Sequence, residues 1–366
     1  MNLHFKGGKF RIMQIADIQE DVPLNPDTVK LIDLAVEKEK PDLVVLTGDQ
    51  IQGYSPCYRD GAQNKVEKCI DSFLEPIVKR NIPFCFTYGN HDDDCKVEKS
   101  AQALMYRKHA SCVVPDDCNT LDEGTYSLKI KDSNNEKDIF ALYIIDSGKK
   151  EPDGSYSPVT KERIEWLKNQ KKQNGYLLSF LFQHIPVPEY YDVLKKCSRF
   201  TKGCVEGFKS RKNTFYILPE EGREEKEFLG ENAGAPEKNS GEFAEIKKDG
   251  DIIAVWVGHD HVNSFRRRLD GVDLGYCQGA GFNTYGPGDK RGVRVFELKE
   301  DDLRNYNTYT VEMGELCDYK PAKPFKEFIF THMPSSIDEG ISLGKKVIVT
   351  AATVGIAAAA IKKIMK

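Results

Sequence analysis

The stretch Trp256-Val257-Gly258-His259-Asp260-His261-Val262-Asn263 decides how the rest of this sequence is interpreted. The residues that lead into it, 252–257 (IIAVWV), are a short uninterrupted apolar run, which predicts a buried β-strand. Two histidines follow within four residues of the end of that run. Taken alone, such a stretch is as compatible with a structural turn as with a metal site, so its meaning depends on the other motifs of the chain.

Four other motifs share this layout, in which polar side chains follow a short apolar run. They are Ala16-Asp17-Ile18-Gln19, Gly48-Asp49-Gln50, Gly89-Asn90-His91-Asp92 and Gln183-His184-Ile185-Pro186. Binding sites in open α/β sheets are built at the carboxyl ends of the strands. Each motif alone is more often a turn or a packed core residue. Five of them in order, each after an apolar strand, indicate one shared site.

The segments between the motifs alternate between strand and helix patterns. Strands are expected at 9–16, 43–47 and 83–87, with helices from Asn25-Pro26 to Pro41 and at about 61–79. This order predicts an α/β fold with a parallel sheet and crossover helices. The second half predicts a hairpin (124–131 and 138–146), a helix at 160–173, and strands near 177–182, 263–268, 272–277 and 292–298.

Composition excludes several function classes. The chain has 366 residues and a net charge of −4. Residues 341–366 hold five lysines and no acid, so the rest of the chain carries −9. An acidic body argues against a nucleic-acid binder. No secretory signal is visible at the N-terminus and the ten cysteines form no Cys-x-x-Cys pair, so we expect reduced thiols and a cytoplasmic location.

The residue types of the five motifs favour a dinuclear metal site. Asp, Asn, Gln and His offer oxygen and neutral imidazole ligands, which suit divalent Mn, Fe, Zn or Co. A single carboxylate such as Asp49 can bridge two such ions, which together generate a hydroxide nucleophile near neutral pH.

Together the motifs resemble the calcineurin-like metallophosphoesterase superfamily over residues 8–298. The stretch 256–263 is most similar to the purple-acid-phosphatase-related group that lacks a signal peptide. The resemblance implies a four-layer αββα sandwich and two divalent metal ions. It also implies metal ligands at Asp17, Gln19 and His261 for the first ion, Asn90, His184 and His259 for the second, and Asp49 as the bridge.

The same resemblance implies the groups that act on substrate. His91 would protonate the leaving oxygen, with Asp92 orienting its ring, and Asn90 and His91 would contact the phosphate. Arg291 is a further candidate for substrate contact, as is Arg266, although a surface charge is the simpler interpretation of each. Asp93 and Asp94 are expected to face solvent.

Two departures from the family pattern affect the expected chemistry. The first motif usually ends in His, and here it ends in Gln19. Since an amide oxygen is a harder ligand than imidazole, Mn becomes the favoured metal, with Fe, Zn, Co or Mg as alternatives. Gln at this position also resembles the manganese-dependent ADP-ribose and CDP-alcohol diphosphatases. Purple acid phosphatases place a Tyr where this chain has Gln52, and Tyr54 lies two residues too late, so we expect a colourless protein.

These inferences predict a metal-dependent hydrolase of phosphomonoesters that uses a bridging metal hydroxide. Its substrate would be a phosphoprotein or a small phosphorylated metabolite. A phosphodiesterase or nucleotide diphosphatase on the same site is the first alternative. A non-catalytic scaffold is the second. The sequence leaves the oligomeric state open.

The predicted domain organisation is a catalytic domain at 8–320, a linker at 321–340 and a basic, apolar tail at 341–366. Within the tail, 347–361 is uncharged and flanked by lysines. As a helix it would measure about 22 Å, shorter than the roughly 30 Å of bilayer hydrocarbon. Membrane contact through 345–366 and a membrane-free tail are both left open. The charged segment 219–240 is expected to be a surface loop or a lid.

Overall fold

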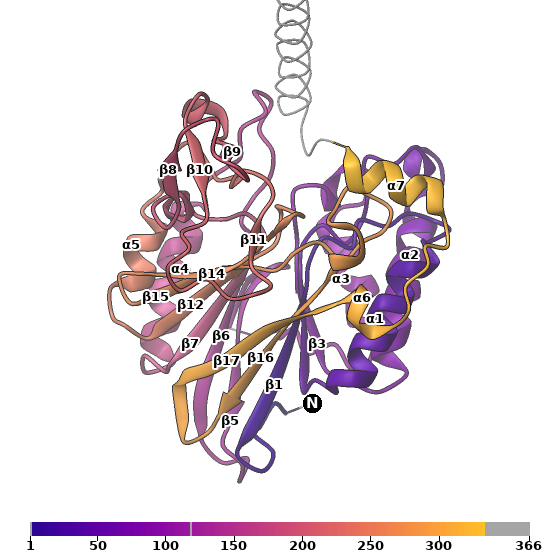
Figure 1. The fold of residues 1–366 in the computed structure, drawn as a ribbon. Coiled ribbons are helices and arrows are strands. Elements are labelled where there is room, and N and C mark those ends of the chain that lie inside the picture. Colours follow the sequence, from indigo (N-terminus) through magenta and orange to yellow (C-terminus); the bar gives the residue numbers. More distant parts are fainter. Residues whose placement is uncertain (1, 118, 334–366) are drawn as a thin grey trace, which may run out of the picture.

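The computed structural model describes residues 2–117 and 119–333. Two β-sheets pack face to face, and helices cover the outer face of each sheet (Figure 1). The fold is therefore the four-layer αββα sandwich that the family resemblance implied. The tail at 341–366 lies outside the described residues.

The first sheet combines parallel and antiparallel strands. Its order is β17 (Asp302–Glu312), β16 (Gly292–Lys299), β1 (Lys9–Ile15), β2 (Leu43–Thr47) and β3 (Phe84–Thr87). Strands β1, β2 and β3 are parallel, with Ile12 opposite Leu43 and Val44 opposite Phe84. Their carboxyl ends therefore meet at one edge of the sheet, whereas β16 and β17 are antiparallel additions.

The second sheet has seven strands, and its central ones are also parallel. Its order is β14 (Arg266–Leu269), β15 (Val272–Tyr276), β12 (Ile252–Val257), β7 (Ser179–Gln183), β6 (Asp138–Ile145), β5 (Thr125–Lys131) and β4 (Thr120–Asp122). Strand β12 is parallel to both β7 and β15, and β6 is parallel to β7. The ends of β7 and β12 thus lie side by side.

The helices complete the outer layers. The first sheet is covered by α1 (Pro26–Glu39) and α2 (Ala62–Val78), with α3 (Lys99–Arg107) beside α2. The second is covered by α4 (Lys161–Gln173) and α5 (Glu242–Lys247). Helix α1 begins as predicted, because the side chain of Asn25 accepts a hydrogen bond from the Asp27 amide and Pro26 takes the first helical position.

Alternating side chains divide the second sheet between two cores. Phe180, Phe182 and Trp256 point toward the first sheet, where their rings lie against Phe296 of β16. Leu181 and other neighbours in sequence point to the opposite face, among the side chains that pack under α4 and α5. The aromatic layer between the sheets fixes how their strand ends face each other.

Several elements were not predicted. Strand β17 and helix α3 are absent from the sequence interpretation, and helix α7 (Pro324–His332) lies inside the segment 321–340 expected to be a linker. Helix α6 (Met313–Leu316) precedes it. Two small sheets complete the fold, β8 (Lys195–Cys197) with β10 (Phe215–Ile217) and β9 (Val205–Glu206), and β11 (Phe228–Leu229) with β13 (Asn263–Ser264). Across the described residues, no helix combines the length and the apolar composition that crossing a membrane requires.

Candidate metal centre

The predicted ligands lie in five loops that follow β1, β2, β3, β7 and β12. Four of these residues have a positive backbone φ, which residues other than glycine rarely adopt. They are Asp17, Gln19, Asp49 and His259. Strained backbone of this kind concentrates at functional sites, where the surrounding structure must hold it. Its occurrence at four predicted ligands is an observation independent of the motifs.

Close packing of the loops explains why glycine precedes Asp49. Gly48 has φ +88°, and a Cβ built there would lie 2.6 Å from the Gly89 amide nitrogen and 2.7 Å from Nδ1 of His184. Loops from both sheets therefore meet at this backbone position. A larger residue would push apart the strand ends that carry the ligands.

The carboxylate of Asp49 lies at the centre of the cluster. Its Oδ1 accepts a hydrogen bond from the His91 amide at 2.7 Å. Its Oδ2 lies 3.0 Å from Nε2 of Gln19 and 3.3 Å from Nε2 of His184. Asp49 therefore touches residues from the loops after β1, β3 and β7, which is the position that a bridging ligand needs.

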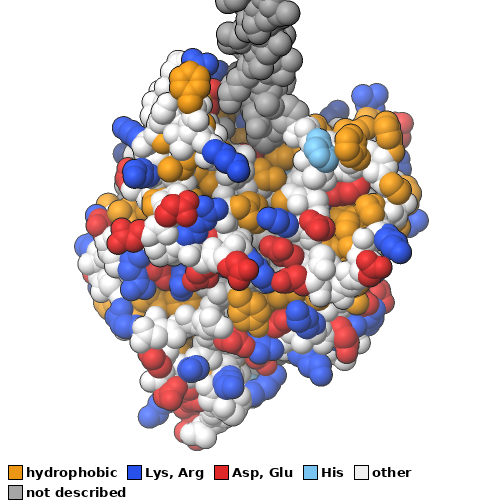
Figure 2. All heavy atoms as spheres, in the orientation of Figure 1, with side chains coloured by type: hydrophobic (Ala, Val, Ile, Leu, Met, Phe, Trp, Pro, Cys, Tyr) orange, Lys and Arg blue, Asp and Glu red, His pale blue; other side chains and the backbone are white. Residues whose placement is uncertain are grey.

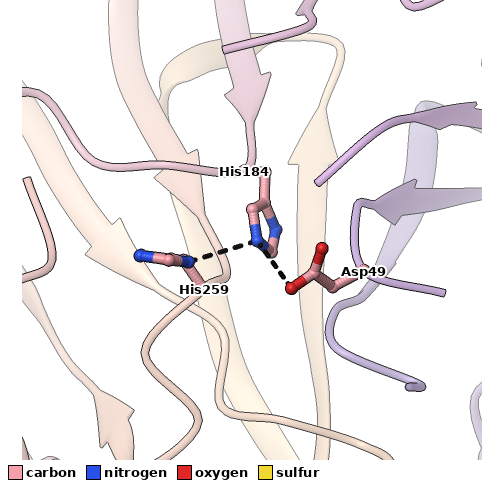
Figure 3. Close-up of side chains that lie close together, drawn as sticks. All are labelled: Asp49, His184 and His259. Atoms are coloured by element: carbon pink, nitrogen blue, oxygen red, sulfur yellow. Dashed lines mark hydrogen bonds and ion pairs between the residues drawn. The ribbon is translucent and has the colours of Figure 1, made fainter. Parts of the chain in front are cut away.

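Two histidines of the second sheet face Asp49. Nδ1 of His259 lies 3.3 Å from Nε2 of His184. The three side chains point toward one another (Figure 3), and one ligand atom from each falls within 4.8 Å of the others. All three are buried, and this spacing could hold a metal ion.

The third histidine lies with Asp17 and Gln19. Nε2 of His261 is 3.4 Å from Oδ1 of Asp17 and 3.3 Å from Nε2 of Gln19. Since the amide nitrogen of Gln19 cannot coordinate a cation, its side-chain oxygen would have to turn into the site. Nδ1 of His261 lies 2.9 Å from the Tyr285 carbonyl, and the Tyr285 ring stacks on the imidazole.

Backbone carbonyls select the tautomers of two histidines. Nδ1 of His184 lies 2.9 Å from the Thr47 carbonyl, as Nδ1 of His261 does from Tyr285. A carbonyl only accepts hydrogen bonds, so Nδ1 carries a proton, and Nε2 is the nitrogen that could bind a metal once its own proton is displaced. Metal-binding histidines are held in this way by outer hydrogen bonds.

Electrostatics couple the carboxylates to the imidazoles. Burial raises the pKa of Asp49, but His184 and His91 outweigh it and hold this pKa far below its usual range. Burial lowers the pKa of His184, and Asp49 then raises it to about 10. The pKa of His259 is lowered by burial and by the charge of His184. A cation bound here would replace the protons that these groups share.

The buried side chain of Asn90 provides a direct test of fit. Neither its amide oxygen nor its amide nitrogen has a hydrogen-bond partner among the described residues. An unpaired buried amide is unfavourable unless a ligand satisfies it. The free oxygen of Asn90, three imidazoles, two carboxylates and the Gln19 amide form a donor set that fits divalent cations.

The expected role of Asp92 is wrong. Its carboxylate accepts hydrogen bonds from the backbone amides of Asp49, Ile51 and Gly89 at 2.9, 2.9 and 2.7 Å, so it ties the loop after β2 to the loop after β3. Asp94 contacts the His91 ring instead, with Oδ2 2.8 Å from Nδ1. The short 3-10 helix that begins at Asp92 turns Asp94 back onto the ring. Asp93 and Asp94 are exposed, as expected, and Asp94 contacts the His91 ring in addition.

Arg291 is buried beside the metal centre and is not positioned as a substrate contact. Its side chain is fully buried, and its guanidinium donates to the Thr284 carbonyl at 2.9 Å and to the Tyr285 carbonyl at 3.3 Å. Its Nε lies 3.5 Å from the Glu327 carboxylate on α7. Arg291 thus supports the backbone that binds His261, which corrects its expected contact with substrate. Arg266 pairs with Glu224 at 2.9 Å.

Three tyrosines lie at the site although the sequence analysis placed none of them there. The Tyr54 hydroxyl donates to the amide oxygen of Gln19 at 3.2 Å, and its ring lies edge-on to His91. Tyr156 lies edge-on to His259, while Tyr285 stacks on His261. Each comes from a loop without metal-ligand spacing.

Part of the segment 219–240 forms a wall of the site. The Gly234 amide donates to the Asp260 carboxylate at 3.2 and 3.1 Å. A Cβ built at Gly234 would lie 2.6 Å from Nε2 of His259. Residues around Gly234 are therefore packed against a predicted ligand, unlike a loop that only covers the surface.

Comparison with known proteins gives a family and a fold. A family model described as Calcineurin-like phosphoesterase matches residues 10–263. "Probable inactive purple acid phosphatase 14" of Arabidopsis thaliana is 27% identical over 335 residues, which cover 80% of this chain and 76% of that protein. "Phosphatase DCR2" of Saccharomyces cerevisiae is 26% identical over 355 residues, which cover 86% of this chain but only 56% of the yeast protein.

A solved structure shares the fold. The crystal structure of a dimetal phosphatase from Danio rerio superposes with a TM-score of 0.51, covering 83% of this chain and 99% of that one. At 11% sequence identity, this likeness establishes the architecture alone.

Proposed function

Because the chain belongs to the calcineurin-like phosphoesterase family, we propose that it is a metal-dependent phosphomonoesterase acting on a phosphoprotein or a small phosphorylated metabolite. The family predicted from the five motifs is thereby confirmed. One observation carries the proposal: the loops of two sheets place six metal-competent side chains within 4.0 Å of another member of the set, namely Asp17, Gln19, Asp49, His184, His259 and His261. Asn90, in the loop after β3, is the seventh proposed ligand and has a buried side chain without a partner among the described residues.

Two divalent ions, with Mn favoured by Gln19, would supply an activated water and neutralise charge on the phosphoryl oxygens. Asp49 would hold both ions, Asp17, Gln19 and His261 the first, and Asn90, His184 and His259 the second. The chain's own contribution is to fix these donors in place. The tie from Asp92 to the loops after β2 and β3, and the carbonyl bonds of His184 and His261, provide that rigidity.

His91 is the group best placed to handle the leaving oxygen. Its backbone amide is anchored to Asp49, and Asp94 fixes its Nδ1, so its Nε2 remains for a substrate proton. General acid catalysis of this kind requires a positioned side chain within hydrogen-bond reach of the leaving atom. Asp94 keeps the ring oriented.

The charge balance of the site supports an anionic substrate. Only Asp17 and Asp49 among the seven proposed ligands are carboxylates. Two divalent cations would therefore leave the site positive inside an acidic body. A phosphate ester fits this charge, whereas an acidic body offers little to a polyanionic nucleic acid.

A second function is favoured by Gln19. An amide at this position also resembles the nucleotide diphosphatases of the same superfamily, so a phosphodiester or diphosphate is the alternative substrate. A non-catalytic scaffold is a third candidate, because the names of the Arabidopsis relatives describe them as probable inactive enzymes. Against it stands the complete set of donors in this chain.

The test is hydrolysis of para-nitrophenyl phosphate and of its bis-ester. Metal-stripped protein reloaded with Mn²⁺ is compared with Asp49→Asn. We expect faster turnover of the monoester and none in the variant. Faster diester hydrolysis would favour the diesterase or diphosphatase. No turnover of either ester, nor of a nucleotide diphosphate, by the metal-loaded protein would favour the scaffold.

A further inference from the structure

Helix α7 has its apolar side facing outward. Phe325, Phe328 and Ile329 follow helical spacing and are 78, 62 and 42% exposed. The inward side is polar, since Glu327 lies 3.5 Å from Arg291 and the α7 carbonyl of Phe330 accepts from the Gly286 amide. Surface helices of globular proteins normally bury their apolar side. An exposed apolar patch of this kind marks an interaction surface.

A second exposed feature lies on the lobe formed by residues 195–217, which contains β8, β9 and β10. Between residues 195 and 212 the sequence holds seven Lys or Arg and a single acid, Glu206, although the whole chain is acidic. Phe200 lies on this lobe and is 87% exposed. Four basic side chains of the lobe are exposed and have no carboxylate of the described residues within 4.0 Å: Lys195, Lys196, Arg199 and Lys202.

The lobe and α7 lie at the same end of the molecule (Figure 1). Figure 2 shows hydrophobic side chains gathered over α7 and basic side chains at the edges of the lobe. Both features adjoin the metal centre. Phe208 of the lobe stacks on Tyr156, which contacts His259. On the other side, Arg291 links α7 to the backbone that binds His261.

We propose that the 195–217 lobe and α7 together form a docking face for an anionic lipid bilayer. Exposed aromatic side chains would enter the interface while basic side chains contact acidic headgroups, a combination whose binding strength adds apolar burial to electrostatic attraction. Docking in this way would place the metal centre close to phosphate esters at the membrane surface. The docking itself does not depend on the proposed hydrolysis.

Two observations favour a bilayer over a protein partner. The apolar and basic side chains are on separate elements at the same end of the molecule, and a broad, flat bilayer surface can contact both elements at once. The sequence also continues from α7 into 347–361, an uncharged run flanked by Lys345-Lys346 and Lys362-Lys363, which suits the same surface.

The experiment measures binding to phosphatidylcholine vesicles with and without phosphatidylserine. Full-length protein carrying Ile348→Asp and Ile356→Asp serves as the parent, so that the tail contributes little. One variant adds Phe325→Ser and Phe328→Ser. A second variant instead neutralises the lobe with Lys195→Gln, Lys196→Gln, Arg199→Gln and Lys202→Gln. A third is the matched control, which removes the same number of positive charges from α1, α2 and α4: Lys30→Gln, Lys38→Gln, Lys68→Gln and Lys172→Gln.

We expect the parent to bind anionic vesicles and each of the first two variants to bind about tenfold more weakly or worse. The matched control should bind within about twofold of the parent, because its lysines belong neither to the lobe nor to α7. Unchanged thermal unfolding shows that the variants are folded. Absence of binding by the parent, or equal binding by all variants, overturns the proposal. A lipid-free dimer that dissociates on Phe325→Ser and Phe328→Ser would also overturn it, in favour of a second copy.

Discussion

The two sheets contribute different chemistry to the same site. In the proposed site, loops of the first sheet would supply oxygen donors, from Asp17, Gln19, Asp49 and Asn90, whereas loops of the second would supply three imidazoles. The contacts of 3.0–3.4 Å that define the cluster run largely between the two sheets. Neither sheet alone holds a complete ligand set. The site therefore exists because the aromatic layer of Phe180, Phe182 and Trp256 fixes the sheets against each other.

Removing one ligand from each sheet tests this dependence and has the largest expected effect. Asp49→Asn and His184→Ala should each lower phosphatase activity by more than about 10⁴-fold, because both metal positions depend on groups from both sheets. Steady-state hydrolysis of para-nitrophenyl phosphate measures the loss. Retention of a tenth of the activity by either variant would mean that one sheet suffices.

Replacement of His91 separates proton transfer from metal binding. His91→Asn should lower kcat by about 10²–10⁴-fold while metal content stays unchanged, because His91 is not among the proposed ligands. Substrates with a better leaving group should recover part of the loss. An unchanged kcat would reject the role of His91 as proton donor.

Replacing Arg291 tests how the chain segment that runs from β15 of the second sheet to β16 of the first is held in place. The chain between β15 and β16 carries Tyr285, and the buried guanidinium binds its carbonyl. Arg291→Met should lower the free energy of unfolding by about 3–5 kcal/mol, because it leaves Glu327 buried without its partner. Urea unfolding measures the change. Full stability combined with a raised KM would restore Arg291 as a substrate contact.

The sequence predicted the strand ends well, since a short apolar run followed by a polar residue marks a buried strand that ends at a site. It could not predict partners that depend on a turn. Asp92 and Asp94 are chemically identical neighbours, and only the 3-10 helix after His91 decides which one meets the ring. The burial of Arg291 likewise depends on Glu327, 36 residues away, in a segment expected to be a linker.

The smallest expected effect comes from giving the first sheet an imidazole ligand of the kind that the second sheet supplies. Gln19→His replaces a hard oxygen donor with imidazole, so the preference for Mn²⁺ over Zn²⁺ should fall by about tenfold. Competition between the two metals, followed by elemental analysis, measures it. No change in preference would show that Gln19 does not set the metal selectivity.

The most direct test of a shared site is the number of ions bound per chain. Calorimetric titration of metal-stripped protein with Mn²⁺ should give two ions for the native chain and fewer than two for both Asp49→Asn and His184→Ala. That result would show that oxygen donors of one sheet and imidazoles of the other hold the same pair of ions. Two ions bound by either variant, or none bound by the native chain, would contradict the account.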